Sequence, residues 1–237
     1  MPYYGYGYGY GMGFDPLYLI VVIVCTLLGL AAQSYINSTY KLWSNVESDG
    51  ARGADVARRM LDSLGCGRVG IRSVGGHLTD HYDPRDNNLY LSPDNLGGGS
   101  VASVAVACHE AGHAVQREHG YAMMKVRTAL VPVVNFAQNI WTLVFILGFA
   151  LDMTGLTAVA VALFGFSVLF QLVTLPVEID ASRRAVRYIR ESGMSEVQVR
   201  GAKKVLTAAA LTYVAAALTS IIQLLYLIIR TRGEQDR

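Results

Sequence analysis

The chain has 237 residues, of which 52% are hydrophobic, and its net charge at pH 7 is +2. This composition is too apolar for an ordinary water-soluble domain, and a charge so close to zero argues against a nucleic-acid-binding protein. The three cysteines are odd in number and follow no C-x-x-C pattern, so they indicate neither a disulfide framework nor a cysteine-rich zinc site.

Four uncharged apolar segments predict four transmembrane helices, because each reaches the roughly 20 apolar residues that are needed to cross a bilayer. They comprise residues 16–36, 131–151, 156–175 and 205–229. No basic segment precedes the first of them, so we interpret it as a membrane anchor and not as a cleaved signal peptide. The Tyr- and Gly-rich tail 1–15 can bury no core, and we assign it no catalytic role; residues 230–237 form a short C-terminal tail.

The region between the first two spans, residues 37–130, is the only sizeable extramembrane part of the sequence and can fold as a small domain. Its predicted elements are a helix at 53–65, strands at 69–74 and 87–92 joined by the polar stretch 75–86, and, within 97–120, a glycine loop followed by a helix. The last helix has Ser100 as a potential N-cap and ends at Gly120. The predicted fold class is mainly α and integral to the membrane, with four transmembrane helices and a small α+β domain.

Basic residues near the ends of the spans predict how the chain is oriented. They flank the 37–130 region and crowd the segment 176–204 between the third and fourth spans, whereas few lie on the opposite side. Because positive residues are retained on the cytoplasmic side, we expect both regions to face the cytoplasm and both termini to lie outside.

Residues 107–119 read ACHEAGHAVQREH and contain the motif H-E-x-x-H at His109, Glu110 and His113. Four residues of α-helix advance about 400°, so the two histidines lie one turn apart on one face and can bind one zinc ion. Glu110 projects from nearly the same side, where it can take a proton from a zinc-activated water and deliver it to a leaving amine. So short a motif also arises by chance, but in a small-residue apolar helix these polar groups would be costly without a function. The motif therefore predicts zinc-dependent peptide hydrolysis in a zincin-like domain.

The third zinc ligand has a local candidate, His119. Some H-E-x-x-H proteases keep their last histidine at this position, but they also have a glycine three residues earlier, where this chain has Gln116. In a continuous helix His119 is rotated by about 120° from the ligand face. We therefore favour a role for His119 at the helix C-terminus, where it interacts with the helix dipole.

The remaining candidates are Glu178 and Asp180, directly after the third span. Two spans separate them from the H-E-x-x-H helix, so both segments lie on the same side of the membrane. The two acids are about 200° apart on a helix and cannot both face the metal. Either of them could instead form an ion pair with Arg183 or Arg184, and the residues alone leave the choice open.

Three segments, VACHEAGHAVQ, LTDHYDPR (78–85) and LPVEIDASRRA (175–185), together resemble the YugP-like neutral zinc metallopeptidases, a family of small multi-spanning bacterial membrane proteins. Their order also resembles the HtpX and CAAX-prenyl-protease group, in which a helix that follows membrane spans supplies a glutamate ligand. The resemblance implies that His109, His113 and Glu178 bind zinc and that Glu110 is the general base. The chain departs from that group at Ser182, which stands in place of an aspartate. A serine hydroxyl could replace the hydrogen bond of that aspartate to a zinc-binding histidine.

His81 is the second predicted catalytic residue. Together with Tyr82 it could donate a hydrogen bond to the oxyanion of a tetrahedral intermediate, and the strand 87–92 could be a free edge to which an extended substrate adds. The alternative is a tight turn in which Asp83 and Arg85 satisfy each other.

Polar side chains within the spans predict hydrogen bonds between the membrane helices, with a polar substrate path as the alternative. They are Asn135, Gln138 and Asn139 on one face of the second span, Gln171 in the third and Gln223 in the fourth.

The predicted function is a membrane-embedded zinc metalloendopeptidase that cleaves membrane or membrane-associated proteins in quality control or processing, with Zn²⁺ as its cofactor. The predicted location is the bacterial inner membrane, with the active site facing the cytoplasm. The expected partners are the lipid bilayer and a protein or peptide substrate, with no nucleic acid; a homo-oligomer or a regulatory membrane partner is left open. The alternative from another class is a non-catalytic zinc-binding assembly or partner-binding factor, and processing of prenylated peptides is a weaker enzymatic alternative.

Overall fold

Four long helices dominate the computed structural model, which describes residues 16–151 and 153–235. They are α1 (Pro16–Ser44), α5 (Ala122–Ala150), α6 (Thr154–Glu191) and α7 (Glu196–Gln235). All four are long and apolar enough to cross a membrane, as their sequences predict. The Tyr- and Gly-rich tail lies outside the described residues.

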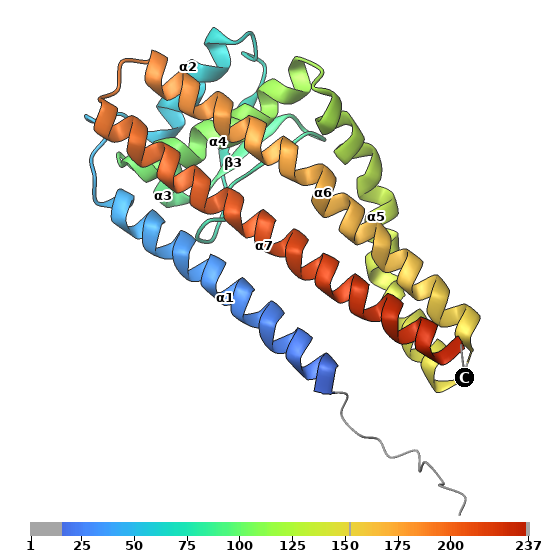
Figure 1. Cartoon of the computed structure of the whole chain (residues 1–237). Helices are drawn as coiled ribbons and strands as arrows, with labels where there is room; N and C mark the ends of the chain where they lie inside the picture. The colour runs from blue at the N-terminus through green and yellow to red at the C-terminus, as the bar shows by residue number, and fades with distance from the viewer. Residues whose placement is uncertain (1–15, 152, 236–237) are drawn as a thin grey trace, which may run out of the picture.

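The long helices pack in the spatial order α5, α6, α7, α1, and the small domain sits at one end of them (Figure 1). Both α6 and α7 continue past the predicted spans into this domain. The segment 176–204, predicted as a connection between spans, is therefore mostly helical. Its chain reversal contains Gly193, whose φ of +85° is a conformation that glycine adopts without strain.

The small domain combines three helices with a three-stranded sheet. The helices are α2 (Gly53–Ser63), α3 (Pro93–Leu96) and α4 (Val101–Glu118), and the strands are β1 (Gly70–Ser73), β2 (His81–Asp83) and β3 (Asn88–Leu91). These bounds confirm the predicted helix 53–65, the predicted helix that follows the glycine loop within 97–120, and the predicted strands 69–74 and 87–92. The short elements β2 and α3 were not predicted, because neither carries an apolar pattern long enough to identify it.

The sheet order is β1-β3-β2, with β1 parallel and β2 antiparallel to β3. Strand β3 is therefore paired on both sides. The expectation that residues 87–92 form a free edge for a substrate is wrong, because part of the polar stretch 75–86 folds back as β2 and occupies that position.

Helix α4 lies at the centre of the domain, between α2 on one side and α6 and α7 on the other. Its N-terminus has the predicted cap, since the Ser100 side chain accepts a hydrogen bond from the backbone N–H of Ser103. The chain leaves the helix through Gly120, at a φ of +67°. Nearly the whole circumference of α4 is buried, so a polar side chain on it needs a partner.

The predicted hydrogen bonds of the second span are absent for three amides. Asn135, Gln138 and Asn139 are exposed, and within the described residues none of them has a hydrogen-bond partner. Next to these amides, the apolar residues Val134 and Ala137 are buried. The prediction that these amides bond to neighbouring helices is wrong, because α5 turns its apolar side chains toward the bundle.

Gly112 allows α4 and α6 to approach closely. A Cβ atom at this position would lie 2.8 Å from the carbonyl oxygen of Ala181, so we expect Gly112→Ala to lower the free energy of unfolding by about 1–3 kcal/mol. Thermal unfolding in one detergent measures the effect. Gly155→Ala is the matched control, because a Cβ at that helical glycine would meet no atom within 4 Å. An unchanged melting temperature for Gly112→Ala would contradict the close contact.

Candidate metal centre

Helices α4 and α6 bring together two histidines and a glutamate that are far apart in the sequence. His109 Nε2 lies 3.2 Å and His113 Nε2 lies 3.5 Å from the same oxygen of Glu178, Oε2. One potential ligand atom from each residue lies within 4.8 Å of the other two. Glu178 and His113 are buried. This is the set of ligands that the family resemblance implies.

The three side chains fit a zinc ion in both chemistry and spacing. Imidazole nitrogens and carboxylate oxygens bind zinc at about 2.0–2.2 Å, so neighbouring ligand atoms in a tetrahedral site are separated by about 3.3 Å. The distances from the two Nε2 atoms to Glu178 Oε2, 3.2 and 3.5 Å, lie close to this value. The atoms are thus arranged as ligands of one ion.

The other ring nitrogen of each histidine has its own partner. His109 Nδ1 lies 3.1 Å from Ser182 Oγ, and His113 Nδ1 lies 3.0 Å from Gln116 Oε1. An amide oxygen only accepts hydrogen bonds, so His113 carries its proton on Nδ1 and leaves Nε2 free for a metal. Ser182 stands where the HtpX and CAAX-prenyl-protease group has an aspartate. Its hydroxyl lies within hydrogen-bond distance of His109 Nδ1.

Gln116 connects His113 to the helix that supplies Glu178. Its fully buried side chain donates from Nε2 to Val177 O at 2.8 Å and to Asp180 Oδ2 at 2.8 Å. Asp180 also accepts from Arg184 Nε at 2.6 Å. Asp180 is therefore outside the three-residue group and helps to fix Gln116, and its predicted alternative role as an ion-pair partner of Arg184 is observed.

His119 also lies outside the group. It is the C-cap residue of α4, and its Nε2 lies 3.1 Å from the carbonyl oxygen of Leu64. The preference for a role at the helix end, in place of metal binding, agrees with this position.

The electrostatic environment of the group suits a cation. Burial disfavours the charged form of His113, but Glu178 and Glu110 favour it and together raise its pKa above the usual value. Cys108, which precedes His109, is turned into the apolar core, where burial raises the pKa of its thiol to about 12. The centre thus offers two imidazoles and two carboxylates, without a reactive thiol.

Two residues that the sequence analysis did not assign to the site interact with the residues of the centre, Gln116 and Tyr213. Tyr213 of α7 interacts electrostatically with Glu178 and Glu110, as well as with Arg127 of α5. Gln116 carries a local signal that could have been used, because it is one turn away from His113. Tyr213 carries none, since its proximity depends on how α7 packs.

His81 is not one of the three residues that form the metal-binding group. Its ring is exposed and stacks on Tyr90 at 5.0 Å between centroids, and its Nδ1 lies 2.8 Å from Thr79 O. A catalytic role for His81 stays a prediction. The alternative, a turn in which Asp83 and Arg85 bond to each other, is observed. Hydrogen bonds from Arg85 lower the pKa of Asp83 to about 2.

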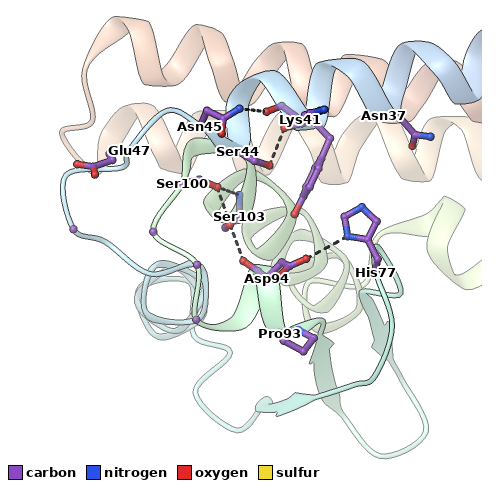
Figure 2. Close-up of a pocket in the computed structure, with 15 residues that line it drawn as sticks. Asn37, Lys41, Ser44, Asn45, Glu47, His77, Pro93, Asp94, Ser100 and Ser103 are labelled. Carbon is purple, nitrogen blue, oxygen red and sulfur yellow. Dashed lines mark hydrogen bonds and ion pairs between the residues drawn. The ribbon is translucent and has the colours of Figure 1, made fainter.

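A separate polar cavity of about 1130 Å³ lies under the last turns of α1, beside the N-terminal end of α4 (Figure 2). Its lining contains none of the metal-binding residues. Its polar groups bond to one another: His77 Nδ1 lies 3.3 Å from Asp94 Oδ2, and Ser103 Oγ donates to the backbone carbonyl oxygen of Asp94. We therefore place the candidate functional site at the metal-binding group and not in this cavity.

Fold and site together define a helical membrane protein with a buried His-His-Glu metal centre. A family model described as "Putative neutral zinc metallopeptidase" matches residues 18–232, and the chain belongs to this family. The chain is also 42% identical over 211 residues to "Putative membrane protease YugP" of Bacillus subtilis (strain 168), a match that covers 88% of this chain and 94% of that protein. No solved structure matches the chain.

Replacing Gln116 should weaken zinc binding. In Gln116→Leu the Nδ1 proton of His113 loses its acceptor, and loss of such an outer partner typically costs 10- to 100-fold in metal affinity. Competition with a chromophoric chelator measures the affinity. Arg183→Leu is the control. Arg183 is an exposed residue of α6, close in sequence to Asp180, to which Gln116 donates. Equal affinities for the two variants would contradict the role of Gln116.

Proposed function

We propose that this protein is a membrane-embedded zinc metalloendopeptidase that hydrolyses peptide bonds of membrane or membrane-associated proteins. The observation that carries the proposal is the position of Glu110, a buried carboxylate close to the His109, His113 and Glu178 group but not part of it. Structural zinc sites normally have four protein ligands, whereas catalytic sites have three and keep one position open. Three ligands with an additional carboxylate beside them favour catalysis.

The proposed reaction uses the residues of the centre in distinct roles. Zinc held by His109, His113 and Glu178 would act as a Lewis acid and lower the pKa of a water at the site to about 7. Glu110 accepts a proton from the attacking water, whose oxygen forms a bond to the peptide carbonyl carbon. Glu110 then delivers this proton to the amide nitrogen as the C–N bond breaks. The products are a carboxylate and an amine.

A hydrogen-bond donor is also needed for the carbonyl oxygen as it gains negative charge. We assign this role to Tyr213, because its side chain interacts with both Glu110 and Glu178. His81 was the candidate from the sequence, but it stacks on Tyr90 on the exposed side of β2.

The substrate class follows from the location of Glu178. This ligand belongs to α6, a helix long and apolar enough to cross the membrane, so the metal centre lies near the lipid boundary. Membrane proteins and their juxtamembrane segments are the polypeptides that reach such a site, which suits quality control or processing. Equal cleavage rates for casein and for a membrane-anchored reporter would contradict this assignment.

We further propose that the centre faces the cytoplasm of a bacterial cell. The ends of α6 and α7 nearest the small domain are rich in arginine and lysine, including Arg183, Arg187 and Lys203. Such residues are retained on the cytoplasmic side of the inner membrane.

A zinc-binding membrane factor without catalytic activity is the second candidate. It would use the same three ligands to stabilise the contact between α4 and α6. Glu110 distinguishes the two functions, because a purely structural site has no use for a buried carboxylate that is not a ligand.

The Glu110→Gln variant tests the proposal. It keeps the size of the side chain but removes the proton acceptor, so we expect one bound zinc per chain and a 10²- to 10⁴-fold loss of casein hydrolysis. Glu118→Gln is the matched control, since Glu118 is an exposed residue of the same helix. If Glu110→Gln hydrolysed casein as fast as wild type and Glu118→Gln, the peptidase proposal would be wrong.

A further inference from the structure

Two asparagines of α5, Asn135 and Asn139, face away from the other helices. Helix α5 is an outer helix of the row, because it packs mainly on α6 (Figure 1). Around α5, Asn139 is turned by about 140° from the buried Val134 and by about 160° from the buried Ala137. Asn135 lies within about 40° of Asn139 on the same side. Both asparagines are exposed, so this side of α5 is open to the lipid in a single copy of the chain.

Neither asparagine side chain has a hydrogen-bond partner in the part of the chain that the structure describes. A pair of amides with the same four-residue spacing on α1 differs in this respect, since Gln33 Nε2 donates to Asn37 Oδ1 at 2.9 Å. The pair on α1 is thus satisfied within its own helix. The pair on α5 keeps its donors and acceptors open.

The depth of the two asparagines makes open amides costly. They follow the start of the uncharged run 131–151 by four and eight residues, which places them about 6 and 12 Å into it along the helix. The hydrocarbon core of a bilayer is about 30 Å thick and contains no groups that form hydrogen bonds with an amide. Asparagine side chains in such a place bond across to another helix. The partner of this pair must therefore come from another polypeptide.

We propose that Asn135 and Asn139 form the contact of a homodimer, in which α5 packs against α5 of a second copy of the chain. Both copies insert with the same orientation, so the two-fold axis runs along the membrane normal and the two helices are parallel. In a parallel two-fold pair, each residue beside the axis meets the same residue of its partner. Asn135 then bonds to Asn135 of the partner subunit, and Asn139 bonds to its own counterpart.

The chemistry of the contact favours a second copy over other occupants. An amide has both donors and an acceptor, so an asparagine is complementary to itself, and one asparagine in the seam of a parallel coiled coil can specify a dimer. A lipid acyl chain offers no polar group. A different protein would have to carry two amides at the same depth and spacing, whereas a second copy carries them by symmetry.

The spacing along α5 also suits a parallel helix pair. Asn135, Asn139 and Ile146 follow one another at intervals of four and seven residues, which is the spacing of a coiled-coil seam. Ile146 is 56% exposed, so the same side of the helix continues with an apolar residue that is free to pack. The dimer is independent of the proposed peptidase function, because none of these residues belongs to the metal centre.

Disulfide crosslinking of the full-length protein in its membrane tests the dimer. Asn135→Cys is compared with Val133→Cys, because Val133 is exposed at nearly the same depth but is turned by about 160° from Asn135. Wild type is the blank, since its three cysteines are buried. On oxidation with copper phenanthroline we expect a covalent homodimer from position 135 and at least about fivefold less from position 133. Equal yields, no product above the blank, or a product that contains a different protein would overturn the proposal.

A second comparison tests whether the amides hold the dimer. Ile146→Cys serves as the reporter, because it lies on the same side of α5 and leaves both asparagines in place; we expect it to form the covalent homodimer. Adding Asn135→Leu and Asn139→Leu removes the amides from the contact, and we expect at least about threefold less dimer. Gln33→Leu with Asn37→Leu is the matched control, because that amide pair is satisfied within α1, and it should leave the yield unchanged. Equal yields from the two double substitutions would overturn the amide contact.

Discussion

The contact between α4 and α6 places a carboxylate of one helix against two imidazoles of the other, and the remaining structure depends on this pairing. A buried carboxylate is costly unless a cation or hydrogen-bond donors compensate it. Glu178 is 2% exposed and meets both His109 and His113. Gly112 permits the approach, and Gln116 ties the same two helices together a turn later. The small domain and the membrane helices are thus joined at the point where the chemistry is concentrated.

One continuous helix gives α6 two functions. Its apolar part is long enough to cross the membrane, and its extension supplies Glu178, Asp180 and Ser182 to the metal centre. The distance from the apolar part of α6 to Glu178 is therefore set by the rise of a single helix and not by a loop.

The sequence was sufficient for the features with a strong periodic or spacing signal. Four apolar runs predicted four long helices, and H-E-x-x-H predicted two ligands because its spacing is that of a helical turn. Glu178 required more than spacing, since only the family resemblance distinguished it from Asp180 and His119. The residues that escaped prediction depend on packing between distant segments: Tyr213 reaches the centre through the position of α7, and β2 forms because β3 offers it an unpaired side. The prediction that the α5 amides bond to neighbouring helices failed for the same reason. The sequence shows that these amides share a face of the helix, but not which way that face is turned.

The claim that Glu178 of α6 closes a metal site with the two histidines of α4 is tested most directly by zinc content. Elemental analysis would compare purified wild type with Glu178→Ala and His119→Ala, each checked for the same elution volume in size-exclusion chromatography. Our account predicts one zinc per chain in wild type and His119→Ala and its loss in Glu178→Ala. Zinc that is retained in Glu178→Ala and lost in His119→Ala would contradict it.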